Sequence, residues 1–120
     1  MGLLNRFIGK KGEDTATLFL KKKHYKILER NYRCRTGEID IIAKDGRYVV
    51  FVEVKERKDD KLGMPSEYVT PSKQRKIISA ARNYMTENEI VDLYCRFDVV
   101  EICGDEINHM ENAFQAKRMT

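Results

Sequence analysis

Two short apolar runs meet at Asp45-Gly46, and this junction constrains the fold of the chain more than any other feature. Asp-Gly between apolar runs is the strongest short-range signal for a β-hairpin, because both turn positions tolerate positive φ angles. The run after the turn, Tyr48 to Val54, is almost continuous in valine, phenylalanine and tyrosine, which is typical of a central strand buried on both faces. The sequence therefore predicts a hairpin over residues 36–55 with a buried second strand.

The register of this hairpin decides which side chains meet. Pairing Lys44 with Arg47 across the turn places Glu38 opposite Glu53. Asp40 then lies on the diagonal from Glu53, about 7–8 Å away at the backbone. At that separation two carboxylates are close enough to share one cation.

Lys55 projects from the same face as Asp40 and Glu53, because side chains alternate between the two faces along a strand. A carboxylate and an ammonium group at the end of a buried strand lower stability unless they are paired or bound to a metal. One interpretation of Glu53 and Lys55 is therefore a salt bridge at a strand end. The other is an active site in which the acidic residues hold a metal ion.

Metal-assisted hydrolysis of a phosphodiester needs each of these residue types. Carboxylates are hard ligands for Mg²⁺ or Mn²⁺, which proteins hold through one or two acidic side chains plus water and substrate phosphate. The bound ion polarises the phosphoryl oxygen and lowers the pKa of a water molecule. Asp40 and Glu53 are the candidate ligands, with the Val54 carbonyl as a third. Lys55 is the candidate for orienting the water or stabilising the transition state.

Asp40 followed by Glu53-Val54-Lys55 at the end of an apolar strand resembles the PD-(D/E)XK nuclease signature of the restriction-endonuclease-like superfamily. The whole chain resembles the YraN family of small bacterial proteins, which are similar to archaeal Holliday-junction resolvases. The matching segments keep their order along the chain: Gly12-Glu13 with Ala16, Arg30-Asn31-Tyr32-Arg33, Gly37-Glu38-Ile39-Asp40, Phe51-Val52-Glu53-Val54-Lys55 with Arg57, Gly63 with Pro65, Lys73, and Arg96-Phe97-Asp98-Val99-Val100. Two positions depart from the pattern: Ile39 replaces the proline of the signature, and His24 stands where glycine is expected before Tyr25.

The resemblance implies a metal-dependent endonuclease that acts on branched or structured DNA. It also implies that Glu13, on the apolar stripe of the first helix, completes the acidic cluster, and that Lys73 lies near the active site. A plain helix-surface glutamate, favoured near a helix N-terminus by the dipole, is the other interpretation of Glu13. Asp98 is interpreted as a salt bridge within its strand, with Arg96 or another cation, rather than as a further ligand.

The remaining elements follow from apolar periodicity and from turn residues. We predict a helix over residues 5–23, a strand over Tyr25–Arg33, a loop from Glu56 through Gly63-Met64-Pro65, a helix beginning at Pro71 with Thr70 as its N-cap, and strands over Leu93–Cys103 and about Ile107–Met110. This order predicts an α/β fold in a single domain over residues 1–120, with a mixed β-sheet of about five strands flanked by helices, as in a restriction-endonuclease-like core.

Basic residues flank the carboxylates on both sides in the sequence. Lysine and arginine number 23 against 19 acidic residues, so the formal net charge is +4. The candidate phosphate contacts are Arg33, Arg35, Arg57, Lys73 and Arg75. A polyanion held against a metal needs this distribution of charge, which makes nucleic acid, by resemblance DNA, the expected partner. A solvated basic surface is the other interpretation of each cluster.

Three cysteines without a CxxC spacing and two isolated histidines offer neither a zinc pattern nor a disulfide framework. We therefore expect reduced cysteines, a cytoplasmic location and, because no apolar segment approaches the ~20 residues of a membrane span, no membrane partner. A homodimer is expected from the two-fold symmetry of junction cutting. The competing hypothesis is a non-catalytic nucleic-acid-binding or scaffold protein that retains the nuclease fold.

Overall fold

The computed structural model describes residues 2–57 and 69–116, and the side chains from residue 11 onward within those ranges. Its elements are α1 (Gly2–Lys22), β1 (Lys26–Cys34), β2 (Gly37–Asp45), β3 (Tyr48–Arg57), α2 (Pro71–Glu87), β4 (Tyr94–Cys103) and β5 (Glu106–Phe114). The predicted start of the second helix is confirmed, because Thr70 accepts a hydrogen bond from the backbone of Lys73 and Pro71 is the first helical residue.

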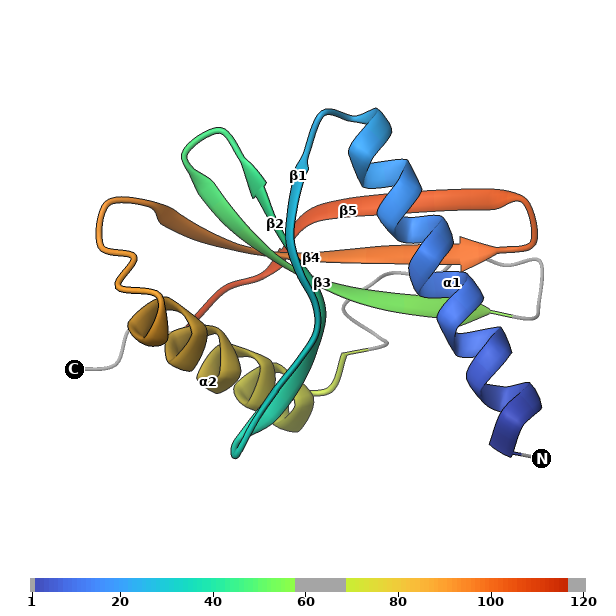
Figure 1. Cartoon of the computed structure of the whole chain (residues 1–120), viewed down its shortest axis with the longest axis horizontal. Helices are drawn as coiled ribbons and strands as arrows, with labels where there is room; N and C mark the ends of the chain where they lie inside the picture. Colours follow the sequence, from blue (N-terminus) through green and yellow to red (C-terminus); the bar gives the residue numbers. More distant parts are fainter. Residues whose placement is uncertain (1, 58–68, 117–120) are drawn as a thin grey trace.

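The five strands form one sheet in the order β1-β2-β3-β4-β5. Neighbouring strands are antiparallel except β3 and β4, which are parallel because α2 carries the chain back across the sheet between them. In Figure 1, α1 and α2 cover opposite faces of this mixed sheet. The predicted α/β class is therefore confirmed. Neither α1 nor α2 is long and apolar enough to cross a membrane.

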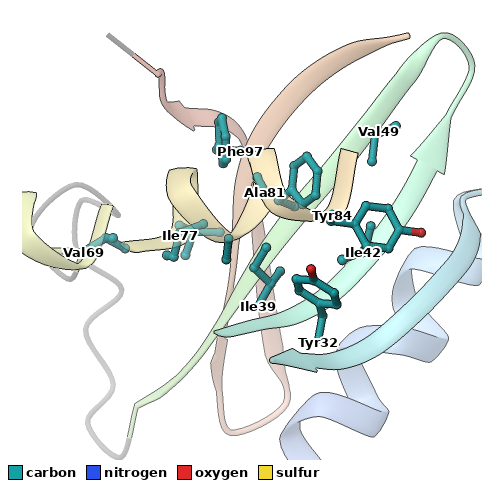
Figure 2. Packing of buried hydrophobic residues seen from close by; sticks show 12 residues of the cluster. Tyr32, Ile39, Ile42, Val49, Val69, Ile77, Ala81, Tyr84 and Phe97 are labelled. Carbon is teal, nitrogen blue, oxygen red and sulfur yellow. The ribbon is translucent and has the colours of Figure 1, made fainter. Parts of the chain in front are cut away.

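Strand β3 supplies side chains to both hydrophobic cores, which explains its unbroken apolar run. Val50 and Val52 pack with Leu20 of α1 on one face. Phe51 packs with Tyr84 of α2 on the other face, in the cluster that Figure 2 shows from close by. Burial of alternate residues on opposite faces follows from the two-residue repeat of a strand.

The predicted hairpin register is wrong by two positions. Asp45, not Lys44, closes the turn, and its partner is Tyr48. Gly46 takes the first turn position with a φ of 59°, which glycine adopts without strain. Arg96 further stabilises this closing pair, since its Nη1 lies 3.1 Å from Asp45 Oδ2 and its guanidinium lies over the ring of Tyr48. A shift of two preserves which residues share a face, but it changes which of them are opposite.

Two strands are longer than predicted. β3 continues through Glu56 to Arg57, so these two residues belong to the strand and not to the loop after it. The rest of that predicted loop lies outside the described residues. β5 extends to Phe114, whose ring stacks on Phe97 of β4 at a centroid distance of 5.2 Å. This aromatic contact explains why the strand continues beyond the polar residues at which the sequence suggested an end.

The departure at His24 has a clear backbone correlate. His24 follows the end of α1 and has a φ of 70°, in the left-handed region that favours glycine. The amide of Tyr25 donates to the Leu20 carbonyl at 3.0 Å and closes the end of the helix. The glycine expected at this position is therefore explained by the conformation, which histidine adopts here with some strain.

Candidate functional site

Asp40 and Glu53 lie where β2 and β3 begin to separate. The last paired residues of the two strands are Ile41 and Val52, so continuing the register by one position sets Asp40 opposite Glu53. Asp40 Oδ2 accepts a hydrogen bond of 2.8 Å from the backbone amide of Val54. The Asp40 carboxylate thus takes the place of the backbone carbonyl that would accept from this amide in a regular sheet. The hydrogen bond holds the carboxylate in one orientation.

The regular alternation of β2 breaks at Asp40. Ile39 packs in the core on the α2 face, whereas Ile41, two residues later, packs in the core on the α1 face. In a regular strand these two side chains would share a face. The irregularity turns the backbone at Asp40 and allows its side chain to reach across to β3. Ile39, in the place of the signature proline, is 2% exposed and serves as the apolar anchor of this turn.

Burial shapes the charge of the acidic pair. The pKa of Asp40 is raised to about 7, chiefly by burial and then by the nearby charges of Glu53 and Glu13, against the lowering effect of the Val54 amide. Glu53 is 5% exposed. Two carboxylates in such a place repel each other unless a proton or a cation lies between them or beside them.

Lys73 supplies a cation at this place. It is the third residue of α2, and its ammonium group forms a salt bridge with Glu53 Oε2. Burial lowers the pKa of the Lys73 amine, but the hydrogen bond to Glu53 and the charge of Asp40 outweigh this effect, so the pKa is raised and the amine stays charged. The helix start that the sequence predicts thereby delivers its lysine to the acidic strands, a contact that only the tertiary fold creates.

Glu13 approaches the acidic pair from α1. Its charge is close enough to raise the pKa of Asp40. Its ion partner is Arg30 of β1, with 3.8 Å between Arg30 Nη2 and Glu13 Oε1, and Arg30 also binds Asp14 at 2.7 Å. Burial raises the pKa of Glu13 and Arg30 lowers it, with a net upward shift. The structure therefore places Glu13 at the margin of the pair and tied to β1.

Lys55 has an acidic neighbour that the sequence analysis missed. In the parallel register Lys55 pairs with Glu101 of β4, whose side chain is fully buried. Phe97 and Val99 pack on the α2 face, so Glu101 lies on that face with Lys55 and Glu53. The available signal was a glutamate within the apolar run Val99-Val100-Glu101-Ile102, but its relevance depends on β4 pairing with β3.

The donor set fits Mg²⁺ or Mn²⁺ better than a metal that needs a full protein cage. Among the described residues, no group of three or more histidine, cysteine, aspartate and glutamate side chains is placed to hold a metal ion. The two carboxylates of Asp40 and Glu53, with the Val54 carbonyl that the sequence predicts as a third ligand, match the sparse protein ligation that is usual for Mg²⁺. Their burial and mutual repulsion give them a reason to accept a divalent cation.

The predicted phosphate contacts separate into three places. Arg33, Arg35 and Lys73 line a cleft of about 610 Å³ between the β1–β2 turn and the start of α2. Arg75 lines a different hollow along α2, and Arg57 lines a third beside α1. Three of the five predicted residues therefore line one cleft, and one of these three, Lys73, also pairs with Glu53 of the acidic pair.

Asp98 is a structural residue, as the sequence analysis expected. It is fully buried and accepts two hydrogen bonds of 3.0 Å from Arg96. Burial raises the pKa of this carboxyl, but the hydrogen bonds from His109, Arg96 and the Asn112 amide outweigh it and hold the pKa below its usual value. The predicted salt bridge with Arg96 is confirmed.

A mixed five-stranded sheet between two helices, with paired carboxylates at the divergence of β2 and β3, defines an α/β protein with an acidic site beside a basic cleft. The chain belongs to the family described as Uncharacterised protein family UPF0102, whose model matches residues 12–102. The YraN proteins are members of it, so the resemblance is confirmed at the level of the family. The matched range contains Glu13, Asp40, Glu53, Glu101 and Lys73.

Bacterial relatives cover almost the whole chain. The UPF0102 protein of Geotalea daltonii is 49% identical over 115 residues, which are 92% of this chain and 91% of that protein. The relative from Geobacter metallireducens is 46% identical over 119 residues, covering 96% of this chain and 98% of its own. A third, from Caldicellulosiruptor saccharolyticus, is 45% identical over 115 residues, covering 91% of this chain and 98% of the relative.

Proposed function

We propose that this protein is a metal-dependent endonuclease that hydrolyses phosphodiester bonds in branched or structured DNA. The observation that carries the proposal is the pair Asp40 and Glu53, which lie together where β2 and β3 begin to separate, with Lys73 against Glu53. The element order supports it: a helix, a three-stranded meander, a crossing helix and a parallel fourth strand agree with a restriction-endonuclease-like core. Family membership supports the resemblance but assigns no activity.

Each residue of the site has a separate role in the proposed hydrolysis. Asp40 and Glu53, with the Val54 carbonyl, would hold Mg²⁺ or Mn²⁺, and the ion when bound supplies Lewis-acid activation of the phosphoryl oxygen and of water. The hydrogen bond from Val54 keeps Asp40 oriented toward Glu53. Lys55, on the same face, donates hydrogen bonds to the attacking water or to the charge that develops on the phosphoryl group. Lys73 adds a second positive charge beside the scissile phosphate.

A cleavage panel tests this proposal. Labelled four-way junction, flap, single strand, duplex DNA and structured RNA are incubated with Mg²⁺, Mn²⁺ or EDTA. Wild type is compared with Asp40→Asn and Lys55→Ala, and with Asp105→Asn as a control, because Asp105 lies exposed in the β4–β5 turn. Cleavage that needs a metal, is lost in both site variants and survives in Asp105→Asn supports the nuclease. Cleavage that is indifferent to EDTA, or binding without cleavage under every condition, overturns it.

One observation favours the second candidate, a non-catalytic nucleic-acid-binding protein that retains the fold. Lys73 already neutralises Glu53, which is sufficient for a structural role of the acidic pair. This candidate predicts that DNA binding is unchanged by EDTA and by Asp40→Asn. The homodimer and the cytoplasmic location stay predictions. Analytical sedimentation would test the homodimer, and cell fractionation would test the location.

A further inference from the structure

A basic cleft adjoins the acidic pair, between the turn that joins β1 to β2 and the first turns of α2. Among the described residues that line it, the cationic side chains are Arg33, Arg35, Lys73 and Lys76. Glu38 is the one carboxylate of that lining, and it binds Arg33 at 3.3 Å. Lys73 is occupied by Glu53. Within the part of the chain that the structure describes, Arg35 and Lys76 form no ion pair and leave the cleft with an uncompensated positive charge.

Gly37 allows the two walls of the cleft to come together. A Cβ atom at this position would lie 2.7 Å from the backbone carbonyl oxygen of Lys76, closer than real side chains approach. The glycine therefore lets the β1–β2 turn pack directly on α2, which brings Arg35 and Lys76 to the same hollow. Two unpaired cations on one cleft repel each other, and an anion placed between them removes that repulsion.

Lys73 connects this cleft to the acidic pair. Its side chain lines the cleft and ends at Glu53, so the two features share one residue and are contiguous. A nucleic-acid strand carries one charge per about 3.4 Å along a duplex axis. A strand with one phosphate at Asp40 and Glu53 therefore carries its next phosphates close beside this one, and Lys73 marks the side on which the cleft lies.

We propose that this cleft binds the phosphodiester backbone of the nucleic-acid strand, next to the bond at the acidic pair, with Arg35 and Lys76 as the phosphate-binding residues. The inference rests on the proposed function for the identity of the strand as substrate. Arg35 offers a planar fork of donors to phosphate oxygens, and Lys76 offers a point charge. Backbone contacts position a strand without reading its sequence, so the cleft selects for a polyanion and not for particular bases. Arg75, in the other hollow of α2, has no part in this site.

Binding without turnover tests the inference directly. Fluorescence anisotropy is measured in EDTA with a labelled single strand of about 12 nucleotides, within the range that one small domain covers. The variants are Arg35→Ala, Lys76→Ala and their double mutant. Arg82→Ala is the matched control, because Arg82 is an exposed cation of α2 that lines the hollow with Arg75. All three positions are exposed, so no substitution opens a core, and thermal melting of each variant verifies the fold.

We expect each cleft variant to weaken binding roughly tenfold and to lower the slope of log affinity against log salt by about 0.7, the value for one single-strand phosphate contact. Arg82→Ala should stay within about twofold of wild type by the same reasoning. Inorganic phosphate should not displace the strand at millimolar concentration. Displacement by phosphate alone would mean that the cleft holds free anions, and this outcome overturns the assignment to a strand.

The outcomes separate this inference from the proposed function. Metal-dependent cleavage together with equal binding by Arg35→Ala, Lys76→Ala and Arg82→Ala would overturn the cleft and leave the nuclease intact. Weakened binding by the two cleft variants in a protein that cleaves nothing would support the cleft and overturn the nuclease. Weakened strand binding in the cleft variants, together with metal-dependent cleavage by the wild-type protein, supports both the cleft and the nuclease.

Discussion

Replacing Asp40 by asparagine should raise the stability of the protein at neutral pH, although the same change should abolish cleavage. In the wild-type protein the Val54 amide donates a hydrogen bond of 2.8 Å to Asp40. Asparagine keeps the shape of the side chain and an oxygen that accepts this bond. It removes a charge that is buried opposite Glu53 and close to Glu13. Functional sites commonly sacrifice stability for activity, and the charge of Asp40 is the one that lowers stability in this protein.

The size of the effect follows from the pKa of Asp40. Its rise from 3.8 to about 7 corresponds to an upper limit of about 4 kcal/mol between the two protonation states. We expect about half of this, ~2 kcal/mol, because the asparagine amide also loses hydration on burial. For a domain of this size that is roughly 8 °C in melting temperature.

The stability difference between Asp40→Asn and wild type should depend on pH. Because the folded-state pKa of Asp40 is raised, its favourable contribution is complete below the unfolded value of 3.8 and is lost as the pH rises toward 7. Asp40→Asn should therefore match wild type near about pH 4 and exceed it most above about pH 7. The assay is thermal denaturation in EDTA across this range, with Asp105→Asn as a control that should show no such trend. A lower melting temperature for Asp40→Asn at neutral pH, or a difference independent of pH, would refute the reasoning.

Three further predictions concern other parts of the chain. Lys73→Met should destabilise the protein by about 1–2 kcal/mol in urea denaturation. This is less than for a fully buried ion pair, because 45% of the Lys73 side chain is exposed. Adding Glu53→Gln to the same chain should recover most of the lost stability, and no recovery would mean that Lys73 acts by packing alone. His24→Gly should stabilise by about 0.5–1 kcal/mol, because glycine adopts the φ of 70° without strain; a lower denaturation midpoint would contradict this. If the acidic pair is the proposed metal site, Mn²⁺ should raise the melting temperature of wild type but not of Asp40→Asn, since a ligand that binds only the folded state stabilises it. Equal shifts in both proteins would place the metal elsewhere.

Several features were predictable because they depend on residues close together in the chain. The cap at Thr70, the apolar run of β3 and a tight turn at Gly46 are local patterns, and the structure shows each of them, although Asp45 closes the turn instead of lying within it. The proximity of Asp40 and Glu53 was also predictable, because both registers, the predicted one and the one that differs by two positions, make the two residues cross-strand neighbours. The break in alternation at Asp40 was not predictable from the sequence pattern.

The register itself was decided by tertiary contacts. A pattern with a period of two cannot distinguish two registers that differ by two residues, and Arg96, distant in sequence, stabilises Asp45 with Tyr48 as the closing pair. The correct register makes Asp40 the direct neighbour of Glu53, where the predicted one had placed Glu38. Glu38 instead pairs with Arg33 on β1.

The sequence by itself determined the strand that carries the acidic pair, the helix that follows it and the face on which the charged groups lie, because hydrophobic periodicity and capping are local. Only the tertiary structure decided that Lys73 meets Glu53, that Glu101 lies beside Lys55, and that Arg35 shares a cleft with Lys76 while Arg75 does not. These relations depend on which strands pair and how closely α2 packs on the β1–β2 turn. Such packing is a property of the whole core, and no local run of residues encodes it.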